Sequence, residues 1–302
     1  MGGRTSASPE IIDYRRSAAL PGVEVIDAQH SPQEWRVVGE DHGLVMFRTW
    51  RGNVRTRGRL HTGHPGVVLC TIPGEAMVAK PDQGPGSFSV LTLRSELLQQ
   101  WLAEQQPSSV QLDWAAVMQP TSARLRSQLC DFFETYEASA PAMQVQSQML
   151  ALSELLISEL VRGAREPRAS AGPPIRGTAR MRECLNEEGL HIDLETLAKR
   201  AGLSRFHALR AFKQRYGLPP HAYQLCLRMN HARSLLRAGA LAADVAQSCG
   251  FADQSHFTRH FKRFNGVTPM KYARAEAGSN DASSSAWRFA KEASALVVRS
   301  DR

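Results

Sequence analysis

The sequence predicts an α+β protein with two domains: a small N-terminal β-barrel followed by a helical pair, and an all-α C-terminal domain with two helix-turn-helix units. Three observations support this fold class. Five strand-like segments follow one another between residues 44 and 93, basic residues concentrate between residues 176 and 274, and one residue pattern occurs twice within that basic stretch. A chain of 302 residues is long enough for a hydrophobic core in each domain.

The N-terminal strands are predicted from composition and from the turn signals between them. Gly-Asn, His-Pro-Gly and Pro-Gly sequences separate short segments that are rich in apolar residues. The predicted strands are Leu44–Trp50, Val54–Arg59, Val67–Ile72, Glu75–Ala79 and Ser87–Leu93. Several short strands at this spacing favour a small barrel or a sandwich.

Helices are predicted after the last of these strands. The first covers Ser95–Glu104, and two longer amphipathic segments follow it. The apolar residues that share a face are Leu125, Leu129, Phe132, Phe133 and Tyr136 in one segment and Val145, Met149, Leu152, Leu156 and Leu160 in the other. Apolar faces of this kind can simply cover the barrel.

The excess of positive charge is confined to one stretch of the chain. Residues 176–274 contain 17 of the 37 Lys and Arg but only 7 of the 29 Asp and Glu, which leaves 20 against 22 elsewhere. A local basic excess is typical of a nucleic-acid-binding module. A solvated surface could carry the same excess, so the motifs within the stretch decide between the two interpretations.

Other features argue against several classes of protein. No apolar segment approaches the roughly 18–20 residues that a membrane span requires, and Met1–Glu10 lacks the apolar stretch of a secretory signal, so we expect a cytoplasmic protein. The five cysteines are odd in number and widely separated, which argues against disulfides and zinc. No paired carboxylates, nucleophile–base motif or phosphate-binding loop stands out, so we expect neither enzyme activity nor a cofactor.

The basic stretch contains an internal repeat in which an apolar residue and Ala precede a Gly, and an R-x-F-K segment follows. The first copy is Leu197-Ala198, Gly202, Arg210-Ala211-Phe212-Lys213 and Gly217, and the second is Val245-Ala246, Gly250, Arg259-His260-Phe261-Lys262 and Gly266. A repeat of this kind indicates a duplicated supersecondary unit. Candidate N-caps and a Gly that can adopt the left-handed conformation predict helix, turn and helix in each copy.

The helix boundaries follow from these caps and turns. The predicted pairs are Leu194–Ala201 with Ser204–Tyr216, capped by Asp193 and Ser204, and Ala242–Cys249 with Asp253–Phe264; Thr268-Pro269 then opens a short helix through Ala275. Between the pairs, Pro219–Ala238 predicts one continuous helix of about 30 Å. That length is close to the roughly 34 Å between successive major grooves on one side of B-DNA.

Helical spacing separates core residues from contact residues in the second helix of each pair. The predicted core faces are Ala208, Phe212 and Tyr216, and Phe257, Phe261 and Phe264. The predicted DNA-contact residues are Phe206, Leu209, Arg210 and Lys213, and Ser255, His256, Arg259 and Lys262. An exposed Arg can bond two acceptors of guanine while Lys contacts phosphate. Solvated or salt-bridged arginines remain the alternative, and His256 could face base, phosphate or solvent.

The stretch from Asp193 to Arg274 resembles the DNA-binding domain of AraC/XylS-type transcription regulators. The residues that carry the resemblance are Leu197-Ala198, Gly202-Leu203-Ser204, Arg210-x-Phe212-Lys213, Gly217, Tyr223, Arg228, Ala232, Leu235-Leu236, Val245-Ala246, Gly250-Phe251, Phe257, Arg259-x-Phe261-Lys262, Gly266 and Thr268-Pro269-x-x-Tyr272. Ala208 departs from the pattern, because the family usually has a larger apolar residue there. The resemblance implies sequence-specific binding to double-stranded promoter DNA, contact with RNA polymerase and, most often, activation.

A second resemblance concerns the N-terminal domain. His64-Pro65-Gly66-Val67-Val68-Leu69 followed by Ile72-Pro73-Gly74-Glu75 is similar to the cupin-like effector domain of the same family, although Met77 stands where the family often has histidine. This resemblance implies a small-molecule effector inside the barrel and a homodimer through the helical pair. Arg48, Trp50 and His61 are candidate effector-binding residues, with turn or surface roles as the alternative.

The barrel contains one candidate group of metal ligands, namely His61, His64 and Glu75. Two histidines separated by two residues do not lie on the same face of a strand, whereas two separated by one residue do. We therefore predict that the barrel holds no catalytic metal.

Together these features predict a cupin-like effector-binding and dimerisation domain at 11–162, a Gly- and Pro-rich linker at 163–178, a DNA-binding domain at 179–275 and a tail of unknown role at 276–302. The predicted function is that of a DNA-binding transcription regulator, most often an activator, controlled by an effector. The alternative is a ligand-independent regulator whose barrel serves only for dimerisation or protein interaction. The sequence identifies neither the effector nor the operator.

Overall fold

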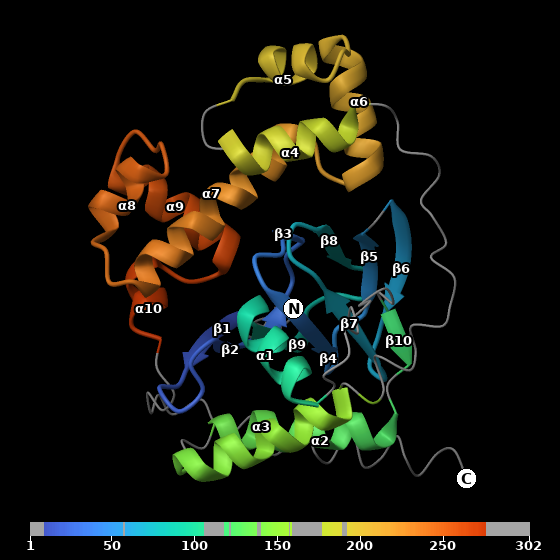
Figure 1. Cartoon of the computed structure of the whole chain (residues 1–302), viewed down its shortest axis with the longest axis vertical. Coiled ribbons are helices and arrows are strands. Elements are labelled where there is room, and N and C mark those ends of the chain that lie inside the picture. The colour runs from blue at the N-terminus through green and yellow to red at the C-terminus, as the bar shows by residue number, and fades with distance from the viewer. Residues whose placement is uncertain are drawn as a thin grey trace, which may run out of the picture.

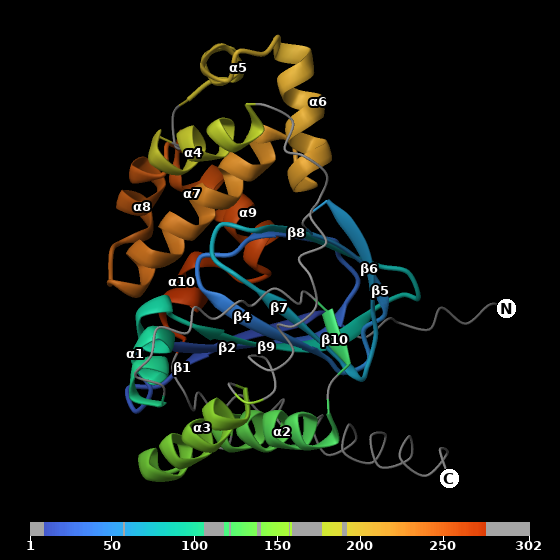
Figure 2. The same cartoon turned by 45° about the vertical axis from the view of Figure 1, so that its right-hand side comes forward.

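The computed structural model describes residues 9–56, 58–105, 118–120, 122–137, 140–156, 158, 177–188 and 192–275 (Figure 1). Most of the predicted linker, the predicted tail and Leu160 lie outside these described residues. The strands lie centrally, helices α2 and α3 lie along one side of them, and helices α4 to α10 lie along the opposite side (Figures 1 and 2).

The strands form two antiparallel sheets. The six-stranded sheet has the order β1 (Ile11–Arg16), β2 (Val23–Ser31), β9 (Gly86–Leu93), β4 (His42–Phe47), β7 (Val67–Thr71) and β10 (Met118–Pro120). The four-stranded sheet has the order β3 (Trp35–Val38), β8 (Ala76–Pro81), β5 (Gly52–Thr56) and β6 (Arg59–Gly63).

The sheets are cupin-like, but they do not close into the barrel that the sequence predicted. In the described part of the chain no strand pairing joins one sheet to the other. The pairing of β2 with β9 shifts register between Ala28 and Ser31, and the next strand, β3, already belongs to the four-stranded sheet. The chain thus changes sheet at this irregularity, and the two sheets stay separate.

The five predicted strands correspond to β4, β5, β7, β8 and β9, with ends that differ by a few residues. Strands β1, β2, β3, β6 and β10 were not predicted. Strand β2 contains the buried polar residues Glu24, Asp27 and Ser31, so it lacks the apolar run or the clean alternation that identifies a strand.

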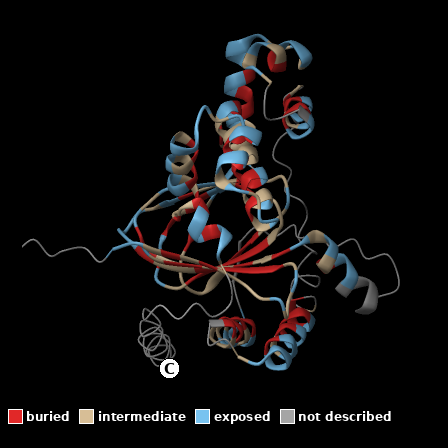
Figure 3. Cartoon of the chain, turned by 90° about the vertical axis from the view of Figure 1, so that its left-hand side faces the viewer, coloured by how far each residue is buried: buried red, intermediate tan, exposed pale blue. Residues whose placement is uncertain are grey.

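Strand β4 shows how the six-stranded sheet is buried on both faces. Leu44 and Met46 belong to the hydrophobic core beneath helices α2 (Ala123–Glu137) and α3 (Ala142–Leu156). Val45 and Phe47, one residue out of phase, belong to a core with Trp50 and other residues of both sheets. Burial on both faces accounts for the continuous apolar run of this strand. Figure 3 shows that buried residues are concentrated in the central strands and on the inner sides of the helices.

The apolar faces of the helical pair cover this sheet. The predicted face residues that the structure describes are all buried in the core beneath α2 and α3: Leu125, Leu129, Phe132, Phe133, Tyr136, Val145, Met149, Leu152 and Leu156. These side chains therefore serve the core of one chain. A dimer formed by the helical pair would have to use its other faces.

The remaining elements are helical. They are α1 (Ser95–Gln105), α4 (Thr178–Glu188), α5 (Leu194–Arg200), α6 (Arg205–Tyr216), α7 (Pro220–Arg237), α8 (Ala242–Ser248), α9 (Gln254–Asn265) and α10 (Pro269–Ala273). The two predicted helix-turn-helix pairs, the helix between them and the short final helix are confirmed. Across the described ranges, no helix is both long and apolar enough to cross a bilayer.

The two domains share their hydrophobic cores. Ile12 and Tyr14 of β1 lie in one cluster with Phe257, Phe261 and Tyr272 of the second helix-turn-helix unit. In the same way, the core of the first unit includes two residues of the four-stranded sheet. These residues are Val38 and Ala76. Each helix-turn-helix unit is thus packed against the N-terminal sheets.

Gly266 provides a test of this packing. It has a positive φ of 76°, and a Cβ at this position would overlap the Ile12 side chain of the other domain. Gly202 also has a positive φ, 66°, but a Cβ there would meet nothing within 4 Å. We expect Gly202→Ala to lower the free energy of unfolding by about 1 kcal/mol, and Gly266→Ala to lower it by about 2–4 kcal/mol because overpacking adds to the backbone strain. Chemical denaturation measures both, and equal losses would contradict the interdomain contact.

Candidate nucleic-acid interface

The second helix of each unit begins and ends with the same hydrogen bonds. At the N-terminus of α6, the Ser204 hydroxyl accepts a hydrogen bond from the His207 amide (3.4 Å). At α9, the Asp253 carboxylate accepts one from the His256 amide (2.7 Å). These bonds satisfy amide groups that the helix itself leaves unpaired. At the C-termini, glycines in the left-handed conformation donate to the carbonyls of Lys213 and Lys262.

The turns also match. Gly202 and Gly250 both have positive φ, of 66° and 72°. The next amide folds back in each unit: that of Leu203 donates to the Ala198 carbonyl, and that of Phe251 donates to the Ala246 carbonyl, both at 2.9 Å. The buried side chains of Ala198 and Ala246 are small, so the two helices of each unit can approach closely. The internal repeat of the sequence is therefore a structural repeat as well.

The predicted contact residues lie on the exposed faces of α6 and α9. Those that are exposed are Phe206, Leu209, Arg210, Lys213, Ser255, Arg259 and Lys262. Phe206 is 76% exposed, which is unusual for so large an apolar side chain and leaves it available for contact. Most of the predicted core residues are buried, including Phe212, Phe257 and Phe261.

Two predicted contact residues are less free than the sequence suggested. The His256 ring is half-buried, with its centroid 5.6 Å from that of Phe251 and 4.6 Å from that of His260. Leu209 is 36% exposed, and it also lines a small cavity against Leu194 of α5 and His221 of α7. Both side chains therefore divide their contacts between the domain interior and the surface.

The repeat also identifies residues that helical spacing alone missed. A shift of 49 positions places Thr258 opposite Leu209 in the pattern, and Thr258 is half-exposed on α9. Arg205 and His207 at the start of α6, and Arg263 on α9, are further polar side chains on these helices. Alignment of one copy of the repeat with the other was the signal that could have found Thr258.

Both helices carry positive charge without compensation along their own length. Neither α6 nor α9 contains an Asp or a Glu. On α9, burial and then the neighbouring His256, Arg263 and Arg259 lower the pKa of His260, which favours the neutral form of this ring. Such a surface attracts an anionic polymer while leaving hydrogen-bond donors for recognition.

Helix α7 separates the two units, and most of its residues are buried or half-buried. Its 18 residues correspond to roughly 27 Å of helix. It contributes Met229 and Ala232 to the core of the second unit, and Tyr223 and Cys226 to the core of the first. The spacing of the two units is therefore maintained by a helix that packs against both.

The three candidate effector residues are not brought together. Trp50 lines a cavity of about 120 Å³ between the two sheets and stacks on Phe47, with ring centroids 5.0 Å apart. His61 pairs with Val54 in register but is not among the residues that line this cavity.

Arg48 lies on the opposite face of its sheet, so its prediction as a cavity residue is corrected. Its guanidinium donates to the Ser89 hydroxyl (2.8 Å) and lies over the Phe133 ring of α2. The physical reason is the strand alternation: Phe47 faces the cavity, so the next residue faces the helices.

The candidate metal ligands were His61, His64 and Glu75. Among the residues that the structure describes, no three His, Cys, Asp or Glu side chains lie close enough together to hold a metal ion. His64 instead has its Nδ1 2.7 Å from the Pro65 carbonyl oxygen.

Comparison with known proteins places this interface in a family. A family model of the AraC type, described as a helix-turn-helix domain, matches residues 197–275. The transcriptional activator RhaS of an Enterobacter species is 31% identical over 186 residues, which cover 60% of this chain and 63% of RhaS. Residues 197–275 therefore match the helix-turn-helix domain of AraC/XylS-type regulators. The transcriptional regulator ArgR of Pseudomonas aeruginosa is 32% identical over 130 residues, which cover 40% of this chain and 39% of ArgR.

A solved structure shares the fold over most of the chain. A variant of apo ToxT from Vibrio cholerae superimposes with a TM-score of 0.53 at 13% identity, covering 86% of this chain and 99% of ToxT. Such low identity supports the fold alone. The chain spans about a quarter to two fifths of the length of several curated relatives that it matches.

Proposed function

We propose that this protein is a sequence-specific DNA-binding transcription regulator of the AraC/XylS type that acts as an activator in the cytoplasm and has no enzyme activity. The observation that carries the proposal is the pair of matched helices, α6 and α9, each with an exposed Arg and Lys at equivalent positions and no acidic residue. The named relatives, which are regulators, support the same conclusion.

In this proposal each unit places its second helix in a major groove. Arg210 and Arg259 contact guanine, while Lys213 and Lys262 contact phosphate. The remaining contacts come from Phe206, Leu209, Ser255 and His256. Because one rigid α7 joins the units, we expect two half-sites about one helical turn apart. Selection of bound sequences from random duplex DNA tests this; recovery of no motif would overturn the proposal.

The finer proposal is that an effector controls DNA binding from the cavity between the sheets. This cavity is lined mainly by apolar residues such as Trp50, Ala79 and Phe88, and its wall also includes Arg233 and Phe264 of the DNA-binding domain. A ligand there would touch both domains. Its volume of about 120 Å³ suits a small apolar compound, since an apolar cavity of about 150 Å³ can hold benzene.

Two partners complete the proposal. RNA polymerase would be contacted by the DNA-bound regulator. A second copy of the chain would dimerise through the outer surface of the helical pair, where Met143 and Leu150 are 81% and 59% exposed. Sedimentation of the intact protein measures the second association.

Substitutions in the two units separate base contact from phosphate contact. We expect Arg210→Ala and Arg259→Ala each to weaken binding to the selected site by about 1–3 kcal/mol and to relax the base preference of one half-site. Fluorescence anisotropy with matched and mutated duplexes measures both effects. If either Arg variant weakened all duplexes equally, its role in base recognition would be wrong.

Lys213→Ala and Lys262→Ala serve as the contrast. Each should weaken binding to every duplex and reduce the slope of log affinity against log salt by about one. Affinities measured between 50 and 200 mM salt, a range over which several phosphate contacts have a large effect, give this slope. An unchanged slope would show that the substituted lysine does not contact a phosphate.

A larger side chain in the cavity between the two sheets tests whether an effector binds there. Ala79 is buried and lines the cavity, so Ala79→Leu should fill part of it and abolish stabilisation by small apolar compounds such as benzene or indole. The same change at exposed Ala151 on α3 is the control. The measurement is the thermal shift of the intact protein across a compound library. Absence of any hit would favour the alternative, an N-terminal domain that serves only for dimerisation or protein interaction.

A further inference from the structure

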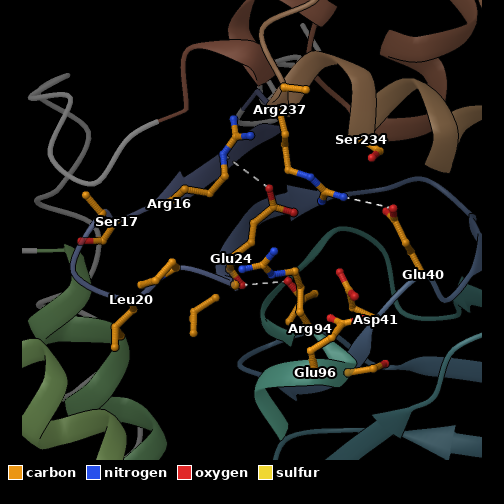
Figure 4. Close-up of a pocket in the computed structure, with 17 residues that line it drawn as sticks. Arg16, Ser17, Leu20, Glu24, Glu40, Asp41, Arg94, Glu96, Ser234 and Arg237 are labelled. Carbon is orange, nitrogen blue, oxygen red and sulfur yellow. Dashed lines mark hydrogen bonds and ion pairs between the residues drawn. The ribbon is translucent and has the colours of Figure 1, made fainter. Parts of the chain in front are cut away.

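A second hollow, the interdomain cleft, lies at the edge of the contact between the two domains (Figure 4). Its volume is about 1070 Å³, slightly above the usual range for small-molecule sites. It is lined by the β1–β2 turn, the β3–β4 turn, the start of α1 and the C-terminal part of α7. Both domains therefore contribute to its walls, and nothing in the sequence pattern pointed to it.

Part of the charge in the cleft is already paired. Arg16 forms an ion pair with Glu24 (3.7 Å), and Arg237 forms one with Glu40 (3.1 Å). Tyr272 donates a hydrogen bond to the same Glu24 carboxylate (3.1 Å) and accepts one from Arg237 (3.3 Å). These four charged groups join the domains and are not free for a ligand.

Three other charged side chains line the cleft without such partners. Among the described residues, Arg94, Asp41 and Glu96 make no side-chain hydrogen bond or ion pair, and Figure 4 shows them around the cleft. Burial, and then the adjacent Glu40 carboxylate, raise the pKa of Asp41, and Arg237 offsets this only partly. A cation placed in the cleft would therefore stabilise the ionised form of Asp41.

These groups limit the chemistry of a ligand. A metal ion is disfavoured, because the described residues bring no three metal-ligating side chains together. A purely anionic ligand would face more acidic than basic side chains, and a purely apolar ligand would leave the charges unsolvated. A molecule with one anionic and one cationic group matches the unpaired charges of both signs.

We propose that the interdomain cleft binds a small zwitterion, an amino acid or a short peptide, whose carboxylate pairs with Arg94 and whose ammonium group pairs with Asp41. Glu96 adds a second acceptor for the cation. Leu20 and Pro21 of the β1–β2 turn supply apolar contact for the remainder of the ligand. Because Ser234 and Arg237 of α7 line the same cleft, the bound ligand would connect the N-terminal sheets to the helix that separates the two DNA-binding units.

The test is calorimetry on the intact protein, which needs no DNA and is therefore independent of the proposed function. The probes are the twenty amino acids, diglycine and triglycine. Sodium propionate and propylammonium chloride at matched ionic strength carry one charge each and serve as reference ligands. We expect at least one zwitterion to bind at least about tenfold more tightly than either reference, since two charge-assisted hydrogen bonds replace one.

Substitutions locate the site. Arg94 is exposed and Asp41 is only half-buried, so Arg94→Gln and Asp41→Asn should fold normally, as melting without ligand will check. Each should weaken zwitterion binding about tenfold, because each removes one charge-assisted contact. Arg59→Gln and Asp82→Asn make the same chemical changes at exposed positions outside the cleft and should have no effect.

Three results would each overturn the proposal. They are failure of every zwitterion to bind, equal binding of propionate or propylammonium, and zwitterion binding that survives both Arg94→Gln and Asp41→Asn. If the protein selected no DNA motif but still bound a zwitterion, only the proposed function would be wrong, and the proposal for the cleft would stand.

Discussion

The buried contact between the first strands and the DNA-binding domain determines how the rest of this molecule is arranged. Asn230 of α7 donates to the Val38 carbonyl (3.0 Å), and Tyr14 donates to the Asn265 carbonyl (3.1 Å), both away from water. Each polar group is satisfied only while the domains are together. Since Ile12 and Val38 also complete the hydrophobic cores of the two units, separating the domains would expose apolar surface and leave polar groups unpaired.

This arrangement gives α7 two roles. It sets the distance between the recognition helices, and it forms a wall of both the intersheet cavity and the interdomain cleft through Arg237. Arg233 and Arg237 share the Glu40 carboxylate, at 3.6 and 3.1 Å, between these two spaces. A ligand that changes the surroundings of Glu40 therefore acts on α7, the helix that joins the DNA-binding units. This is how ligand binding and DNA binding would be coupled.

Local sequence signals predicted the two helix-turn-helix units well, because their helices depend on local interactions, but they did not predict α4 (Thr178–Glu188). Caps such as Ser204 and Asp253, glycines at the turns and the spacing of Phe257 and Phe261 all act within a few residues. Strand β2 has no such signal. It contains buried Glu24 and Asp27, whose partners include Tyr272 and Ser89, far away in the chain. Long-range partners of this kind cannot be recognised from neighbouring residues.

The N-terminal site was predicted less well for a related reason. Trp50 lines the cavity, but Arg48 follows the inward-facing Phe47 and so faces α2. The alternation of the strand could have shown this. The cavity walls contributed by Phe264 and Asn265, and the whole interdomain cleft, depend on how two domains pack. No periodicity within one element encodes that.

The central claim is that both repeats contact DNA as parts of one rigid unit. Amide hydrogen exchange of the intact chain, alone and with a duplex recovered by selection, tests it most directly. The account predicts slower exchange in the segments that contain α6 and α9, to a similar extent and in the same complex. Slowing in only one of the two would contradict the claim that each repeat contacts its own groove.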